Sequence, residues 1–188
     1  MPPEEMWSGF FDPNTVLKKL GLTSNCRDIL EFGCGYGTFT IPAARRVAGT
    51  VYALDIDPDM AWVTAARAAQ APAPNIVVER RDFVTAGSGR ADGSAALAIL
   101  FNILHLEDPV DLLREARRIL GPEGAAAVIH WRGDIDTPRG PPLHIRPPPE
   151  QCAAWAEQAG FAAHIVRNLP DSPWHWGMLL HPAVILES

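Results

Sequence analysis

The chain has 188 residues, of which 47% are hydrophobic and 20% charged, and its formal net charge is −6. This length is enough for one domain with a sizeable core, and the composition excludes global disorder. The negative charge disfavours nucleic acid binding through a broad basic field, because phosphate backbones are repelled, and leaves only a local basic patch as a route to it.

The cysteine count and the apolar runs indicate where the protein works. Three widely spaced cysteines, Cys26, Cys34 and Cys152, form neither a disulfide framework nor a metal-binding pair, which fits a reducing cytoplasm. The first six residues lack the basic and apolar regions of a signal peptide. The longest apolar run, residues 95–104, is too short for a membrane span. We expect a soluble cytoplasmic protein without a membrane span.

The first half of the chain alternates between strand and helix patterns. Asp12-Pro13 predicts the start of a short helix that ends at Gly21. An apolar run at 29–32 predicts a strand, which is followed by a glycine cluster and a helical pattern at 39–47. A strand at 50–54, a helix capped by Asp57-Pro58, and strands at 76–79 and 95–103 follow.

The second half continues the alternation and then breaks it. Asp108-Pro109 predicts a helix that stops at Gly121-Pro122, before a strand at 125–131. Residues 132–149 are rich in proline and glycine and predict a long surface loop. A helix at 150–159 and two closing strands, at 163–166 and 174–180, complete the pattern. The prediction is a single doubly wound α/β domain, whose mostly parallel seven-stranded sheet has helices on both faces.

A glycine-rich turn follows the first strand, where this fold class binds ligands. Its sequence is Glu31-Phe32-Gly33-Cys34-Gly35-Tyr36-Gly37. A dinucleotide fold would carry its third glycine at position 38, which is occupied by Thr38, so the spacing argues against a nicotinamide cofactor. A tight turn without a ligand is the alternative interpretation.

Two acids also follow strands at the expected ligand edge. Asp55 ends the second strand, about twenty residues beyond the glycines, where a carboxylate can accept hydrogen bonds from both ribose hydroxyls. Asp57 precedes Pro58 and is better explained as a helix cap. Asp82 follows the third strand and can meet an adenine amino group, with a solvated loop acid as the alternative.

Together these residues resemble the class I S-adenosylmethionine-dependent methyltransferases from about residue 29 to 161, and most closely the small-molecule branch that includes ubiquinone and menaquinone biosynthesis methyltransferases. The resemblance implies a Rossmann-like three-layer domain over residues 28–188, after an N-terminal segment (1–27) that carries the short helix. It also implies S-adenosylmethionine as the methyl donor. In that family the glycine loop holds the methionine end, the acid after the second strand holds the ribose, and the acid after the third strand meets an adenine packed between apolar side chains. The residues to which these cofactor-binding roles carry over are Glu31, Gly33, Cys34, Gly35, Gly37, Asp55, Ile56, Asp82, Phe83 and Asn102.

The acceptor is less clearly encoded than the donor. The (N/D)PP(Y/F) signature of many nitrogen methyltransferases of nucleic acids and proteins is absent after the fourth strand, so we expect a small-molecule acceptor rather than a nucleic acid. Methyl transfer from a sulfonium depends mainly on positioning. If the acceptor must lose a proton, His105 is the candidate base, and a structural histidine at the strand end is the alternative.

The irregular parts of the chain are expected to shape the acceptor pocket. Candidate residues, with ordinary packing or a solvated loop as the alternative, are Trp7, Phe10, Phe11, His144 and Arg146. The run Trp174-His175-Trp176 predicts a strand with aromatic packing, and we expect no metal site. Two rival functions remain: a non-catalytic S-adenosylmethionine-binding sensor or assembly protein, and a nucleotide- or nicotinamide-binding oxidoreductase.

Overall fold

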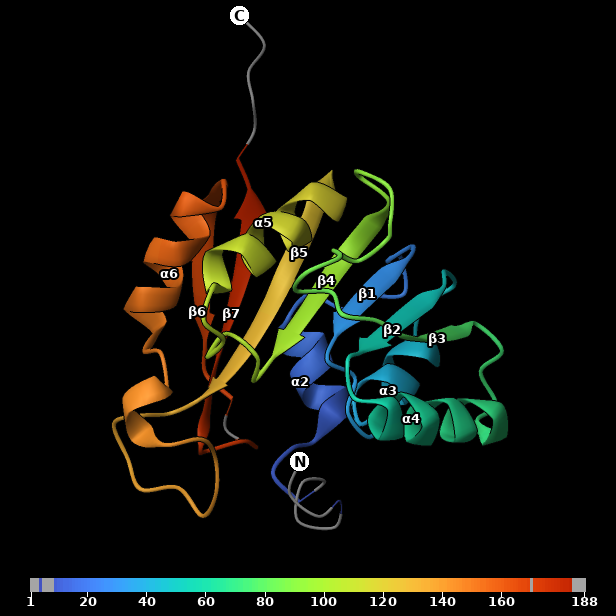
Figure 1. Cartoon of the computed structure of the whole chain (residues 1–188), viewed down its shortest axis with the longest axis horizontal. Helices are drawn as coiled ribbons and strands as arrows, with labels where there is room; N and C mark the ends of the chain where they lie inside the picture. Colours follow the sequence, from blue (N-terminus) through green and yellow to red (C-terminus); the bar gives the residue numbers. More distant parts are fainter. Residues whose placement is uncertain (1–3, 5–8, 170, 184–188) are drawn as a thin grey trace, which may run out of the picture.

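A seven-stranded sheet with the order β3-β2-β1-β4-β5-β7-β6 forms the centre of the molecule (Figure 1). The computed structural model describes residues 4, 9–169 and 171–183. The first five strands pair in parallel, and β7 runs antiparallel between β5 and β6. The strands are β1 (Ile29–Phe32), β2 (Val51–Asp55), β3 (Ile76–Arg80), β4 (Ala95–Phe101), β5 (Leu120–Trp131), β6 (Phe161–Arg167) and β7 (His175–Pro182). The predicted fold class, a mostly parallel seven-stranded α/β sheet, is confirmed.

Helices cover both faces of this sheet, as Figure 1 shows, with α5 and α6 on one face and α2, α3 and α4 on the other. A proline opens four of them, because its fixed φ suits the first helical position. The helices are α2 (Pro13–Lys19), α3 (Thr40–Ala44), α4 (Pro58–Gln70), α5 (Pro109–Ile119) and α6 (Pro149–Gln158), with a short 3₁₀ turn at Leu143–Ile145. None of the helices within the described residues is long and apolar enough to cross a membrane.

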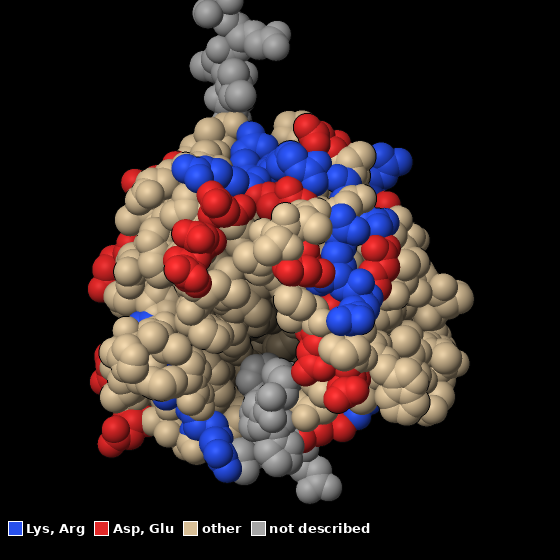
Figure 2. All heavy atoms as spheres, viewed as in Figure 1, with Lys and Arg blue, Asp and Glu red and all other residues tan. Residues whose placement is uncertain are grey.

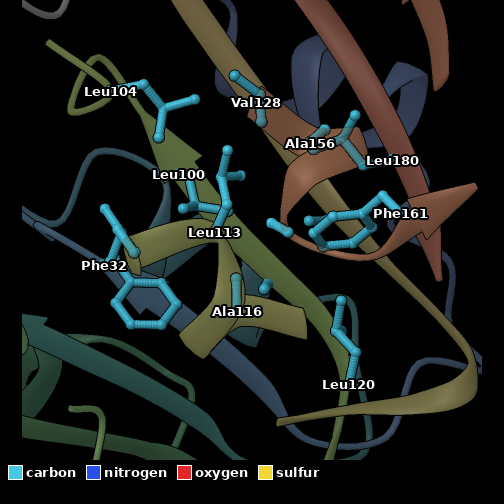
Figure 3. Packing of buried hydrophobic residues seen from close by; sticks show 14 of the residues in the cluster. Phe32, Leu100, Leu104, Leu113, Ala116, Leu120, Val128, Ala156, Phe161 and Leu180 are labelled. Atoms are coloured by element: carbon cyan, nitrogen blue, oxygen red, sulfur yellow. The ribbon is translucent and has the colours of Figure 1, made fainter. Parts of the chain in front are cut away.

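Side chains of alternate strand residues build two apolar cores, one on each face. Leu30 and Phe32 of β1 lie in the core under α5 and α6, while Ile29 lies in the core under α2 and α3. Figure 3 shows Leu113 and Ala116 of α5 among the buried residues of the first core. Burying an aliphatic side chain of this size contributes roughly 1.5–3 kcal/mol, so the two cores hold the strand ends in a fixed order.

The predicted caps of α2 and α4 are confirmed, and that of α5 is not. Asp12 accepts the N–H of Asn14 at 3.0 Å, and Asp57 accepts the N–H of Asp59 at 2.9 Å. Asp108 stands at the N-cap of α5 without a side-chain hydrogen bond to it. Proline at the first position therefore marks the start of α5 without help from the preceding acid.

Several element boundaries differ from the sequence prediction. Strand β4 ends at Phe101 rather than residue 103, because Asn102 adopts a φ of 57°, outside the range of a strand. Strand β5 starts at Leu120, directly after α5, rather than at residue 125. Helix α3 has five residues instead of spanning 39–47. The amide of Asn75 donates to the carbonyls of Ala44, Val47 and Gly49, and so satisfies carbonyls that a longer helix would have bonded.

Candidate functional site

A cavity of about 380 Å³ lies at the carboxyl edge of β1, β2 and β4. Ligands of doubly wound sheets bind beyond this edge because the loops that leave parallel strands meet there. Most of the residues singled out by the sequence reach this cavity. The predicted residues that line it are Glu31, Gly33, Cys34, Gly35, Asp55, Ile56, Phe83, Asn102 and His105.

The glycine-rich turn after β1 forms part of the cavity wall. Gly33, Gly35 and Gly37 have φ angles of 74°, 53° and 73°, in the left-handed region that side chains disfavour. The N–H groups of Gly33 and Cys34 both donate to the carbonyl of Leu54, so the turn stays against the end of β2. The three glycines are therefore required by the shape of the turn, which brings the backbone of Gly33 and Gly35 to the cavity.

Asp55 joins the two turns that border the cavity. One of its carboxylate oxygens accepts the N–H of Gly35 at 2.8 Å, and the other accepts the N–H of Asp57 at 3.0 Å. Its side chain is buried and lines the cavity. Each carboxylate oxygen has a second acceptor site, so Asp55 can still receive hydrogen bonds from a ligand that carries hydroxyl groups.

Glu31 is a buried acid at the base of the cavity. Thr40 donates its hydroxyl to the Glu31 carboxylate. Burial raises the pKa of Glu31 to about 8, and the negative charge of Asp55 acts in the same direction, while the bond from Thr40 opposes the shift. A cationic ligand in the cavity would favour the ionised form, so the site is suited to a ligand that carries positive charge.

Asn102 brings an unpaired amide to the cavity. Its side-chain oxygen and nitrogen are both buried and find no hydrogen-bond partner among the described residues. A buried amide without partners costs about 1–3 kcal/mol, and such groups are rare in folded proteins. A ligand that bonds to Asn102 would remove this cost.

Two predicted site residues do not line the cavity. Gly37 lies at the far end of the glycine turn, with Thr64 of α4 beside it. Asp82 is half-buried and accepts the N–H groups of Val84 and Thr85, so its carboxylate closes a turn and does not line the cavity. Its neighbour Phe83 is buried, lines the cavity and packs edge-on against Phe32 at 5.4 Å.

His105 lines the cavity beside a second histidine that the sequence did not single out. The ring of His130, at the end of β5, lies 5.5 Å from the ring of His105 at an angle of 80°. Burial lowers the pKa of His105, and it lowers the pKa of His130 to about 3. Both imidazoles are therefore neutral near pH 7, the form in which a histidine can accept a proton.

The aromatic residues proposed to close over the site have other positions. Phe10 packs against Trp131 and Trp174, and Phe11 packs against Phe39, all within the core under α2 and α3. Phe39 itself lines the cavity, so Phe11 supports the site from behind rather than covering it. Trp7 lies outside the described residues.

The loop residues proposed to touch the substrate are placed apart from this cavity. Arg146 donates to the carbonyls of Pro141 and Arg132 and to the hydroxyl of Thr137, so it holds the proline-rich loop together. His144 is exposed in the 3₁₀ turn. Neither residue lines the first cavity.

Sequence reasoning missed the two threonines that support the site. Thr40 bonds to Glu31, and Thr64 of α4 donates to the carbonyl of Gly35 at 2.7 Å. Both are fully buried. Threonine in a helix is too common to attract attention, and a polar residue at a buried helical position was the one available signal.

The geometry of the site agrees with the match to known families. Residues 29–124, just over half of the chain, match the model of a family described as Methyltransferase domain. The chain belongs to this family. It is an S-adenosylmethionine-dependent methyltransferase. The cavity fits such a donor, because it joins buried acids, an unpaired amide and apolar side chains in one space.

Individual relatives extend the comparison. The methyltransferase is 28% identical over 179 residues to a probable ribosomal RNA small subunit methyltransferase A from Pyrobaculum aerophilum, covering 86% of this chain and 72% of that protein. Its fold is similar to a SAM dependent methyltransferase from Aquifex aeolicus (TM-score 0.81, 23% identity, 92% of this chain and 90% of the other). It is also similar to a putative type 11 methyltransferase from Sulfolobus solfataricus (TM-score 0.68, 22% identity, 95% and 93%).

The raised pKa of Glu31 makes the stability of this methyltransferase depend on pH. The unfolded chain releases the Glu31 proton near its ordinary pKa of 4.5, whereas the folded protein holds it until about pH 8. This contribution to folding is complete below pH 4.5 and is lost as the pH rises to about 8. The free energy of unfolding should therefore fall by up to about 1.4 kcal/mol per pH unit across this window because of Glu31.

Glu31→Gln should remove this slope, as measured by urea denaturation at several pH values in the window. The exposed Glu123→Gln is the matched control and should keep the slope of the wild type. Parallel curves for the wild type and Glu31→Gln would show that Glu31 is ionised in the folded protein.

Proposed function

We propose that the protein transfers a methyl group from S-adenosylmethionine to a small-molecule acceptor, with His105 as the general base. The observation that carries the proposal is the cavity itself, in which His105 shares one space with Glu31, Asp55 and the unpaired amide of Asn102. The acids and the amide suit the donor, and His105 is the group of this cavity that can take a proton from the acceptor.

The donor roles follow from the chemistry of each group. Asp55 would receive the ribose hydroxyls, because a carboxylate accepts two hydrogen bonds side by side. Glu31 and Asn102 would face the methionine end, whose ammonium suits the acid and whose carboxylate suits the amide N–H groups. Ile56 and Phe83 would hold the adenine between apolar surfaces. When bound, the donor supplies a methyl group whose bond to sulfur breaks with the electron pair remaining on the sulfur.

His105 is suited to take the proton that an acceptor hydroxyl releases. Its imidazole is exposed enough to meet a substrate and lines the cavity. The proton moves from the acceptor oxygen to the free imidazole nitrogen while that oxygen forms its bond to the methyl carbon, and the imidazolium later returns the proton to solvent. The neighbouring His130 is held neutral by burial and adds no positive charge that would oppose this step.

The small size of the acceptor is supported by the distribution of charge. Figure 2 shows the face of the molecule that is also seen in Figure 1. Acidic and basic side chains are intermingled on it, and it is hollowed near its middle. Several arginines are neutralised by acids, as in the pairs Arg90 with Glu79 and Arg118 with Asp92. Since phosphate backbones need a continuous field of unpaired cations, this surface favours a small molecule over RNA.

The acceptor class can be tested with donor that carries a labelled methyl group. The wild-type protein is incubated with the low-molecular-mass fraction of a cell extract and, separately, with total RNA of the same cells. We expect label in small molecules. Label in RNA alone would overturn the proposal and would agree with the name of the Pyrobaculum relative.

Asp55→Ala should weaken the binding of S-adenosylhomocysteine by about 1.5–3 kcal/mol, because charge-assisted hydrogen bonds to the ribose are lost. Calorimetric titration measures this change. Asp57→Ala is the matched control: it should lower the free energy of unfolding by about 1 kcal/mol through the cap of α4 while affinity stays close to that of the wild type. The reverse pattern would show that the two acids have exchanged roles.

His105→Gln should lower the rate of methyl transfer by about 10²–10⁴-fold while the affinity for S-adenosylhomocysteine is unchanged. The wild-type rate should rise with pH up to the pKa of His105, which burial places below the ordinary value of 6.5, and should then level off. The variant should lose this acid limb. The exposed His144→Gln serves as control, and a His105→Gln rate close to that of the wild type would assign catalysis to positioning alone.

A further inference from the structure

A second cavity of about 500 Å³ lies under the proline-rich loop. Its apolar wall is formed by Leu143 and Pro148 of the loop, by Pro149 at the start of α6 and by Trp176 of β7. Trp176 is the second residue of β7. Because β5 and β7 are antiparallel, it lies opposite His130, near the end of β5. The second cavity is therefore built on the same edge of the sheet as the first.

The two arginines that line this second cavity already have hydrogen-bond partners within the protein. Arg132 forms a two-bond pair with Asp134, at 2.9 and 2.6 Å. Arg146 is held by the loop carbonyls that it bonds. The remaining charged residue of the lining, Glu150, is an exposed acid. The lining thus holds two arginines and two acids and carries no net formal charge, and the N–H groups of Arg146 are taken up by the loop. Such a lining favours an uncharged ligand.

One buried polar group of the wall has no partner in the described part of the chain. It is Nε1 of Trp176, a residue that lines the cavity and is 7% exposed. The indole nitrogen can only donate a hydrogen bond. Because a buried polar group without a partner is costly, this indole indicates a ligand whose acceptor atom bonds to it.

The same residues link the two cavities. The ring of Trp176 is stacked on the ring of His130, with centroids 6.3 Å apart and planes 25° apart. His130 in turn lies beside His105, which lines the first cavity. A molecule seated against Trp176 is therefore linked to His105, the proposed base, through the ring of His130.

We propose that the cavity under the proline-rich loop binds the methyl acceptor, and that the acceptor is a neutral planar molecule whose hydroxyl or carbonyl oxygen accepts a hydrogen bond from Trp176. This inference rests on the proposed function, because that function is what makes the ligand of this cavity a methyl acceptor. The flat indole and the prolines fit an aromatic ring, and a lining without net formal charge favours a neutral molecule over a phosphate.

Binding can be tested with 2-naphthol as the probe and naphthalene-2-carboxylate as its charged counterpart on the same ring system. Nitrogen-15 labelling of the tryptophan indoles gives one resonance per tryptophan, and Trp176→Phe identifies that of Trp176. In the complex with S-adenosylhomocysteine, 2-naphthol should shift this resonance, and the carboxylate should bind about tenfold more weakly.

Trp176→Phe should weaken 2-naphthol binding by about tenfold, the loss expected for one hydrogen bond, while S-adenosylhomocysteine still binds and so reports a folded protein. Trp62→Phe, at a side chain that is 72% exposed on α4, is the matched control and should change nothing. An unmoved Trp176 resonance up to the solubility limit of 2-naphthol, equal affinity for both probes, or unchanged affinity of Trp176→Phe would each overturn the inference.

The labelling experiment with the cell extract tests the proposed function, and the 2-naphthol titration tests the binding site. Either one can therefore fail without the other. Label in RNA together with 2-naphthol at Trp176 would overturn the small-molecule acceptor and leave the binding site in place. Label in small molecules without a response at Trp176 would overturn the binding site alone.

Discussion

The shape of the first cavity depends on the carboxylate of Asp55, which binds two of the turns that border it. It receives the N–H of Gly35 from the turn after β1 and the N–H of Asp57 from the turn after β2. These two turns are neighbours because β1 and β2 pair in parallel and end at the same edge. Thr64 holds the glycine turn from the side of α4 through the carbonyl of Gly35. The position of the glycine backbone is thus set by Asp55 and Thr64 together with the carbonyl of Leu54, and the rest of the cavity is built around it.

Unpaired polar groups gather where the two cavities meet. Asn102, His130 and Trp176 each carry a buried polar atom without a partner, and Glu31 is an acid buried against another acid. Each such group lowers the stability of the folded protein by an amount of the order of 1–3 kcal/mol. The two apolar cores on the faces of the sheet offset this cost. Asn102 lines the first cavity and Trp176 the second, so a ligand in either cavity could satisfy one of these groups.

The chemistry of the two cavities is different, and under the proposed function this difference would separate the two substrates. Glu31 and Asp55 place acidic groups in the first cavity, which suits a donor with a sulfonium and an ammonium. The second cavity has an apolar wall and as many acids as arginines in its lining, which suits an uncharged molecule. The two neutral histidines, His105 and His130, lie between them. A charged donor and a neutral acceptor would therefore enter neighbouring sites without competing for either.

The sequence by itself determined the fold class, the family and most of the predicted residues that meet in the first cavity. Apolar periodicity, proline at helix starts and the spacing from the glycines to Asp55 are local features, and each constrains the chain where it stands. They predicted which residues lie along the ligand edge, because parallel strands bring their carboxyl ends together. Element boundaries were less predictable, since the end of α3 depends on Asn75, which lies more than twenty residues away.

Only the tertiary structure decided which side chains face the cavities. Asp82 follows the third strand as predicted, yet its carboxylate closes its own turn, an outcome that the spacing cannot distinguish from a ligand contact. His130 and Trp176 come from β5 and β7, far apart in sequence, and become neighbours through an antiparallel register that no local pattern specifies. Arg146 and Phe11 were placed by packing and by the carbonyls of a folded loop. Local spacing thus encodes the glycine turn and the acid that follows β2, whereas the second cavity is assembled from distant segments whose contacts exist only after the sheet has formed.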